Sequence, residues 1–164
     1  MNLKRLTTIS TFVAILVAPS AYSELYQIKS KHRNLCLEYR GSGSGVIGKN
    51  TCSFNSISNF TWDIQPTGDV TPDNKEVVNI YSSVNYGCLV DAESSKYAPL
   101  EINCPHTVPK YQWVLREHSQ HNGRQMYVIQ SMAGQCLNIG RNSGKIYALN
   151  CHGRFDQLWY LEKM

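Results

Sequence analysis

The sequence predicts an all-β domain in which one structural unit is repeated three times. Three observations predict this fold class: six cysteines that fall into three couples, one tryptophan at the end of each unit, and short apolar stretches separated by turn residues. The chain has three tryptophans, and each unit uses one of them. A regular repeat of this kind indicates a supersecondary unit that stacks on its own copies.

The three units cover about residues 24–70 (unit one), 71–120 (unit two) and 121–164 (unit three). Each unit has an apolar strand, then a Cys-Leu pair, then a second cysteine 15 or 16 positions after the first. The tryptophan follows the first cysteine by 26, 25 and 23 positions. The cysteine couples are Cys36 and Cys52, Cys88 and Cys104, and Cys136 and Cys151, and the tryptophans are Trp62, Trp113 and Trp159.

Within the units, apolar residues alternate over short stretches such as "YQIKS", "CLEYR" and "TWDIQ". Alternation with Gly, Asn, Ser and Pro in between is typical of strands and turns, and Asn122-Gly123 is a strong hairpin signal. A propeller typically needs about four blades or more, so three units exclude it. Three units of about four strands each predict a β-trefoil of about twelve strands, with one tryptophan per unit buried in the core.

The cysteines predict three disulfides, one in each unit. Their number is even, and exported domains normally oxidise their cysteines. The count alone leaves many pairings open, but the separations of 16, 16 and 15 positions favour pairing within each couple. The chain has no Cys-x-x-Cys spacing of the kind zinc sites use, so we expect no metal and no other cofactor.

Residues 1–23 predict a signal peptide. Lys4 and Arg5 precede the apolar stretch "FVAILVA", and Ala21 and Ser23 supply the small residues of a cleavage site. The apolar stretch is too short for a membrane anchor, which needs about 20 residues. We therefore expect a secreted chain, or a periplasmic one if the host is bacterial.

The charge of the mature chain is close to neutral. The signal segment holds two of the 16 basic residues and none of the 12 acidic ones, so its removal lowers the net charge from +4 to +2. This balance gives no support for nucleic acid as a partner. No later segment is long and apolar enough for membrane insertion to be expected.

The stretch "GSGSGVIGKN", residues 41–50, contains both a dinucleotide-type glycine spacing and most of a phosphate loop. A phosphate loop needs Ser or Thr after its lysine and a helix beyond it. Here Asn50 follows Lys49, and Cys52 leaves no room for a helix. The sequence therefore predicts a turn between two strands of unit one, and we expect no nucleotide there.

The repeated pattern of Cys-Leu, a second cysteine and a closing tryptophan resembles the ricin B-type (R-type) β-trefoil lectins. Gln157-Leu158-Trp159 matches their Gln-x-Trp signature in full, whereas units one and two keep only the tryptophan. The resemblance covers residues 24–164 and implies carbohydrate binding. The family's site combines a carboxylate after the first cysteine, an aromatic ring before the second, an Asn, and the Gln of Gln-x-Trp.

The resemblance implies sugar-binding residues in two units. In unit one, a carboxylate and an Asn are present but the ring is missing; in unit three, an Asn replaces the carboxylate and a tyrosine lies near the ring position. The candidates are Glu38, Asn59, Asn138, Tyr147, Asp156 and Gln157. Unit two has Val90 at the carboxylate position, Asp91 one place later and Ile102 at the ring position, so we expect it to be scaffold.

Other roles for these residues stay open. Glu38 and Asn138 also fit ordinary surface loop residues, and Gln157 also fits a structural role in which its amide satisfies backbone groups. Asn59-Phe60-Thr61 is a glycosylation sequon, which matters only in a eukaryotic host.

The sequence predicts a non-catalytic protein whose partners are glycans or a glycoprotein receptor. Every cysteine is expected in a disulfide, no His-Glu-x-x-His motif occurs, and no catalytic residue is assigned. The alternative function is a receptor-binding or assembly subunit of a secreted multi-chain toxin. In its small size, expected export and incomplete sugar sites, the chain is similar to the lectin-like binding subunits of cytolethal distending toxin. A catalytic toxin subunit would then be the partner.

Overall fold

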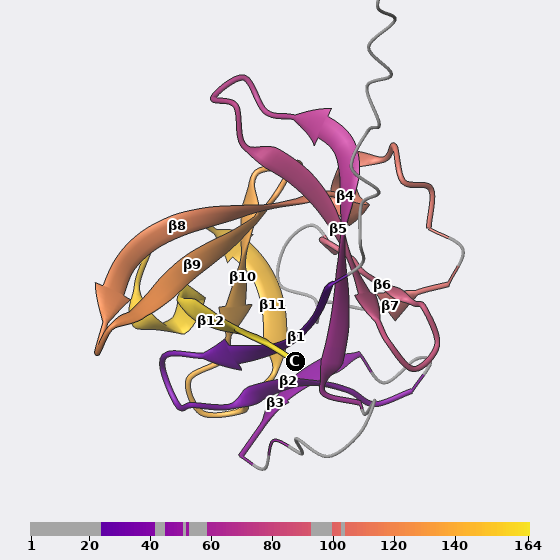
Figure 1. Ribbon diagram of the computed structural model, residues 1–164. Helices are drawn as coiled ribbons and strands as arrows, with labels where there is room; N and C mark the ends of the chain where they lie inside the picture. The colour runs from indigo at the N-terminus through magenta and orange to yellow at the C-terminus, as the bar shows by residue number, and fades with distance from the viewer. Residues whose placement is uncertain (1–23, 42–44, 51, 53–58, 93–99, 103) are drawn as a thin grey trace, which may run out of the picture.

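The computed structural model describes residues 24–41, 45–50, 52, 59–92, 100–102 and 104–164. The predicted signal peptide, residues 1–23, lies outside the described residues. The described chain contains twelve β-strands and two short 3-10 helices (Figure 1). In order these are β1 (Glu24–Ser30), β2 (Cys36–Tyr39), β3 (Val46–Lys49), β4 (Thr61–Val70), β5 (Glu76–Ser82), β6 (Cys88–Leu89), β7 (Leu100–Glu101), η1 (Pro109–Tyr111), β8 (Trp113–His121), β9 (Arg124–Ser131), β10 (Gln135–Ile139), β11 (Ile146–Asn150), η2 (Phe155–Gln157) and β12 (Trp159–Lys163).

Six of the strands close into a barrel. Strand β1 pairs with β12, β12 with β9, β9 with β8, β8 with β5, β5 with β4, and β4 returns to β1, always antiparallel. The other six strands form three hairpins, β2–β3, β6–β7 and β10–β11, each joined to the barrel strand that precedes it. This arrangement of four strands per unit is a β-trefoil and confirms the predicted fold class (Figure 1).

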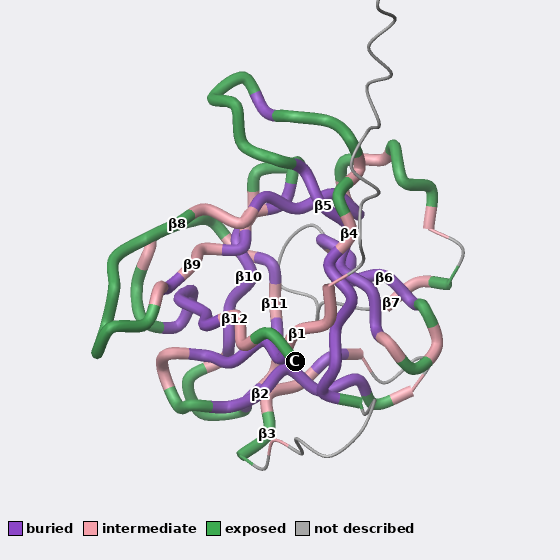
Figure 2. The backbone as a smooth tube through the Cα atoms, viewed as in Figure 1, coloured by how far each residue is buried: buried purple, intermediate pink, exposed green. Residues whose placement is uncertain are grey.

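The three tryptophans lie at the centre of the core. Each is fully buried, and each indole N–H donates a hydrogen bond to the carbonyl oxygen of the leucine in its own unit's Cys-Leu pair. The Nε1···O distance is 3.0 Å in all three units: Trp62 to Leu37, Trp113 to Leu89, and Trp159 to Leu137. Figure 2 shows the buried parts of the strands inside the molecule and the exposed parts at the hairpin tips. The predicted burial of the tryptophans is confirmed.

The three disulfides pair cysteines within the units, as the spacing predicts. Each bond ties the first strand of a hairpin to the segment that follows the second strand, with Cα atoms 5.7, 6.3 and 5.0 Å apart. The bonds are Cys36–Cys52, Cys88–Cys104 and Cys136–Cys151. A disulfide over a loop of this size adds roughly 3 kcal/mol in the chain-entropy model.

Two predicted turns are found in the structure. Asn122 and Gly123, with φ of 52° and 74°, join β8 to β9. Two successive positive φ values are typical of the hairpin turn that Asn-Gly favours. Strand β2 pairs with β3, which is itself the second half of the glycine-rich stretch at 41–50, so the predicted connection between two strands is found and the stretch also supplies one of them. Residues 42–44 lie outside the described residues.

Gly48 allows the hairpins of units one and three to touch through their backbones. Its N–H donates to the carbonyl oxygen of Gly144 at 2.6 Å, and Ile47 forms an isolated bridge with Lys145. A Cβ atom on Gly48 would lie 2.5 Å from Cδ1 of Ile139. The glycine therefore serves packing between units and has no phosphate to hold.

The described residues contain no helix that is long and apolar enough to cross a membrane.

Replacing Gly48 by alanine tests this contact. We expect Gly48→Ala to lower the free energy of unfolding by about 1–3 kcal/mol, because the added methyl overpacks against Ile139. Ile139→Val removes the clashing Cδ1 atom, so the same change should cost less in that background. Urea denaturation of the two single variants and the double variant measures the coupling. If the losses of unfolding free energy in the two single variants add up to the loss in the double variant, the proposed contact between position 48 and Ile139 is contradicted.

Candidate functional site

Unit three contains a cleft of about 520 Å³ beside its β10–β11 hairpin. Three of the residues predicted from the sequence, Asn138, Tyr147 and Asp156, line this cleft together. Its other lining residues come from the same hairpin and from the loop that follows it: Ile139, Gly140, Arg141, Leu149, His152 and Arg154. The cleft is therefore the place where the expected sugar-binding positions of unit three meet.

Strand register places the polar and apolar sides of the cleft. Asn138 on β10 lies directly opposite Tyr147 on β11, so the two side chains share one face of the hairpin. Leu149 is two residues beyond Tyr147 and lies on that same face. Asn138 is buried, while Tyr147 and Leu149 are half-buried. A planar amide thus stands beside an aromatic ring and an aliphatic side chain.

Asp156 supplies the carboxylate of the cleft from η2. Its side chain is 10% exposed, and Oδ2 accepts a hydrogen bond from Nε of Arg141 at 3.3 Å. Its other oxygen, Oδ1, is buried and has no hydrogen-bond partner among the described residues. Arg141 itself is 62% exposed, so its single contact with Asp156 is weak and readily exchanged. The carboxylate therefore lies at the cleft with its exposed contact to Arg141 open to exchange.

Gln157 faces the protein rather than the cleft. It is fully buried, and its Oε1 accepts hydrogen bonds from the backbone N–H groups of His152 and Gly153 at 2.8 and 3.2 Å. Its Nε2 donates to the carbonyl oxygen of Asn150 at 2.9 Å. These bonds fix the loop that carries one wall of the cleft, which corresponds to the structural alternative for this residue.

In unit one the candidate carboxylate is already paired. Glu38 is 7% exposed, and its oxygens lie 3.2 Å from Nε of Arg40 and 3.6 Å from Nζ of Lys49. Asn59 is exposed, and its backbone carbonyl accepts a hydrogen bond from the N–H of Tyr39 at 2.7 Å. The two candidates therefore lie on neighbouring segments, but the carboxylate is neutralised by two cations.

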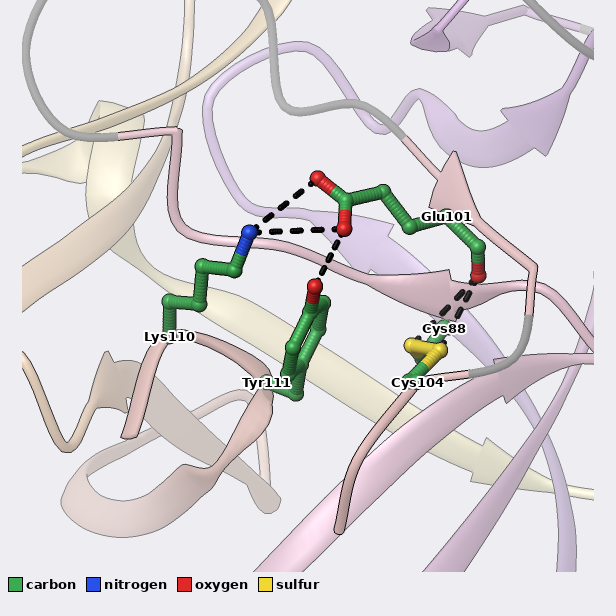
Figure 3. A network of polar contacts seen from close by, with 5 residues as sticks. All are labelled: Cys88, Glu101, Cys104, Lys110 and Tyr111. Carbon is green, nitrogen blue, oxygen red and sulfur yellow. Dashed lines mark hydrogen bonds and ion pairs between the residues drawn. A yellow bond between two sulfur atoms is a disulfide. The ribbon is translucent and has the colours of Figure 1, made fainter. Parts of the chain in front are cut away.

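Unit two carries a network of its own side chains at the corresponding hairpin (Figure 3). Nζ of Lys110 lies 3.3 Å from both carboxylate oxygens of Glu101, and the hydroxyl of buried Tyr111 donates to the same carboxylate. The hydrogen bond with Tyr111, and to a smaller extent the one with Glu101, raises the pKa of Lys110. Both sulfur atoms of the Cys88–Cys104 disulfide contact the backbone carbonyl of Glu101. The polar side chains beside this hairpin are thus bound to one another, while the expected carboxylate and ring positions hold the apolar residues Val90 and Ile102.

Asp91 of unit two points into the protein. It is 1% exposed, and its carboxylate accepts a hydrogen bond from the hydroxyl of Ser131 in unit three. Its backbone N–H donates to the carbonyl of Lys110 at 2.8 Å, the same cross-link that Tyr39 makes with Asn59 in unit one. The one-residue shift along the strand thus turns this carboxylate away from the hairpin surface.

Three basic residues of the cleft are absent from the sequence-based candidates: Arg141, His152 and Arg154. They lie in the turn of the β10–β11 hairpin and in the loop after β11, segments whose course the repeat pattern does not define. The signal in the sequence is weak: His152 and Arg154 closely follow the second cysteine of unit three, whereas Arg141 lies ten positions before it. In the described part of the chain, no group of three or more His, Cys, Asp or Glu residues is placed to hold a metal ion.

Comparison with known proteins supports the fold. No family model and no curated protein matches the chain. Among solved structures, the β-trefoil BEL is similar with a TM-score of 0.67 and 14% identity, over 89% of this chain and 98% of that one. The C-half of an earthworm R-type lectin, solved in complex with GalNAc, has a TM-score of 0.56 and 20% identity, over 86% and 99%.

A toxin is also among the similar structures. A mosquitocidal holotoxin matches with a TM-score of 0.63 and 15% identity, and the match covers 87% of this chain but 16% of the toxin chain. At these identities the likeness concerns the fold. The chain is a β-trefoil whose structural neighbours include R-type lectins and a toxin.

The structural role of Gln157 is testable. We expect Gln157→Ala to lower the free energy of unfolding by about 2–4 kcal/mol, because three backbone groups lose their partner at once. In hydrogen exchange, the amides of His152 and Gly153 should lose protection first. Gln120→Ala, at an exposed position on β8, is the matched control and should be nearly neutral. Unchanged protection of the two amides would contradict this role.

Proposed function

We propose that the protein is an exported, non-catalytic carbohydrate-binding module whose sugar site is the cleft of unit three. The observation that carries the proposal is the meeting of Asn138, Tyr147 and Asp156 around one cleft of about 520 Å³. The volume lies within the range of about 300–1,000 Å³ that small-ligand sites occupy. Its β-trefoil neighbours include an R-type lectin in complex with GalNAc.

The chemistry of the cleft suits a pyranose. A sugar ring has an apolar face of C–H groups, which packs on an aromatic or aliphatic surface such as Tyr147 and Leu149. Its hydroxyls come in neighbouring pairs, which bind planar groups that offer two polar atoms, here the amide of Asn138 and the carboxylate of Asp156. The Asp156 side chain is 10% exposed, and its contact with the exposed Arg141 is one that a sugar hydroxyl could replace.

The same cleft favours binding over hydrolysis. Glycosidases place two carboxyl groups about 5 to 10 Å apart across the scissile bond. Among the described residues that line the cleft, Asp156 supplies the single carboxylate, and it is paired with Arg141. This supports a module that holds glycans without cleaving them.

Three disulfides are typical of proteins in an oxidising compartment, and a signal peptide at residues 1–23 would bring the chain there. Extracellular glycans or glycoproteins are then the accessible partners. In unit one Glu38 is paired with two cations, and in unit two the corresponding positions hold the apolar residues Val90 and Ile102, so one site per chain is proposed.

A glycan array followed by calorimetry on the best glycan tests the proposal. We expect Asn138→Ala and Asp156→Ala each to weaken binding by about tenfold or more, because each removes hydrogen bonds to sugar hydroxyls. Glu38→Gln in unit one is the comparison and should bind normally, since Arg40 and Lys49 already occupy that carboxylate. Thermal melts check that every variant is folded. A wild-type protein that binds no glycan would refute the proposal.

A second candidate function is a receptor-binding or assembly subunit of a multi-chain secreted toxin. Unit two exposes three apolar side chains on neighbouring segments: Val84 and Tyr86 in the turn before β6, and Ile102 directly after β7. They are 47%, 67% and 58% exposed, and β6 pairs with β7, which brings the two segments together. Exposed apolar groups that gather in this way are typical of surfaces that bind another protein.

Purification from the native host tests this second function. If unit two binds a partner chain, the protein should elute in a complex larger than a single copy of the chain, and Tyr86→Ser with Ile102→Ser should release it. Val70→Ser, at an apolar residue that is 62% exposed near the tip of the β4–β5 hairpin, is the control. A native protein that is strictly monomeric would argue against a toxin subunit.

A further inference from the structure

A second cavity adjoins the proposed sugar cleft. It has a volume of about 530 Å³, close to that of the cleft itself. The cleft and the cavity share three lining residues, Arg141, Arg154 and Asp156, which therefore form the wall between them. The cavity alone is lined by His32, His118, Ser119, Met126, Gly153, Phe155 and Leu158.

The cavity is assembled by tertiary structure from four separate segments, one of which is the β10–β11 turn that carries Arg141. His32 comes from the turn after β1, His118 and Met126 come from the β8–β9 hairpin, and Phe155 comes from η2. Met126 and Leu158 are buried and form part of one core cluster, whereas the Phe155 ring is 66% exposed. The cavity is thus lined by buried apolar side chains of the core and by one exposed aromatic side chain.

The charges around the cavity are cationic. Asp156 is the one carboxylate among the described lining residues, and two arginines, Arg141 and Arg154, line the cavity with it. Arg154 is exposed, and its guanidinium forms no ion pair within the described residues. His32 and His118 add imidazoles on the far side of the cavity. The unpaired charge of Arg154 lies on the wall that both spaces share, so a ligand in the cleft would reach it.

We propose that this cavity binds the anionic group of an acidic saccharide whose neutral ring occupies the cleft. The proposal rests on the sugar-binding function of the cleft and names its ligand class: glycans that carry a carboxylate or a sulfate ester. Arg154 is the principal anion ligand, because guanidinium groups match the two oxygens of either anion. Phe155 and Met126 pack against the apolar parts of the acidic residue, such as an N-acetyl methyl group.

The arrangement explains why an acidic residue is favoured over a second neutral sugar. A neutral extension would leave the Arg154 charge without a partner, while a carboxylate or sulfate pairs with it in a partly enclosed space. A hydrogen bond to a charged group contributes enough binding free energy to favour the acidic ligand over the neutral one by about tenfold or more in affinity. Because the site is open to solvent, added salt should reduce this preference.

Calorimetry with matched ligands tests the proposal. The ligands are a galactose-terminated disaccharide, the same disaccharide carrying sialic acid, and the same disaccharide carrying a sulfate ester. We expect the wild-type protein to bind at least one acidic form about tenfold more tightly than the neutral form. The two acidic arms distinguish a carboxylate from a sulfate as the preferred group. Inorganic sulfate should compete with the acidic ligand and leave the neutral one unaffected.

Variants locate the effect in the cavity. Arg154→Gln should bring the ratio of acidic to neutral affinity close to one. Phe155→Ala, at a residue that lines only the second cavity, should weaken the acidic ligand and leave the neutral one unchanged. Lys75→Gln is the control, because it also removes one positive charge but at an exposed position in the β4–β5 loop. This variant should keep the ratio of acidic to neutral affinity of the wild-type protein.

The outcomes separate this proposal from the function on which it rests. Equal affinity of the wild-type protein for the neutral and both acidic ligands would overturn the anion site and leave the sugar cleft standing. A preference for the acidic ligand that survives in Arg154→Gln would overturn the assignment to this cavity. If the wild-type protein binds none of these saccharides and no glycan on the array, both proposals fail.

Discussion

The structure depends on one hydrogen bond that occurs three times. In each unit the indole N–H of the tryptophan reaches the carbonyl oxygen of the leucine after the first cysteine, at 3.0 Å and inside the core. A buried N–H or carbonyl left without a partner costs about 1–3 kcal/mol, so this geometry is strongly preferred. The bond joins the last barrel strand of a unit to the hairpin of the same unit. The adjacent disulfide holds the two strands of that hairpin together. The side chains that the hairpin carries on its surface are therefore held in fixed positions relative to the core.

This constraint leaves the next position along the hairpin free to differ. The residue after the bonded leucine is Glu38 in unit one, Val90 in unit two and Asn138 in unit three, while the leucine and tryptophan stay the same. In unit one the acid is paired with two cations, and in unit two Lys110 pairs with Glu101. Only the third position opens onto the cleft of about 520 Å³ described above. A shared core thus supports three different surfaces, and the proposed function needs just one of them.

The proposed ligand site owes its character to segments outside the repeat. Arg141 and Arg154 come from two turns of unit three, and they divide the space beside the hairpin into a cleft and a second cavity. Asp156 connects the two, with one oxygen held by Arg141 and the other without a partner. The lectin-like positions account for how a neutral ring is held. The basic residues of the turns account for which glycans the protein would prefer.

The sequence by itself determined the β-trefoil, its disulfides and its buried tryptophans. Repeated spacing is a one-dimensional pattern, and short-range bonds such as Cys136–Cys151 follow from it directly. It also located the cleft, because Asn138, Tyr147 and Asp156 lie close to the cysteines and the tryptophan of one unit. Only the tertiary structure decided that Gln157 faces the backbone, that Glu38 is neutralised, and that His32 and His118 face a cavity beside Arg154. These facts depend on side-chain direction and on contacts between segments as much as 120 residues or so apart, where spacing carries no information.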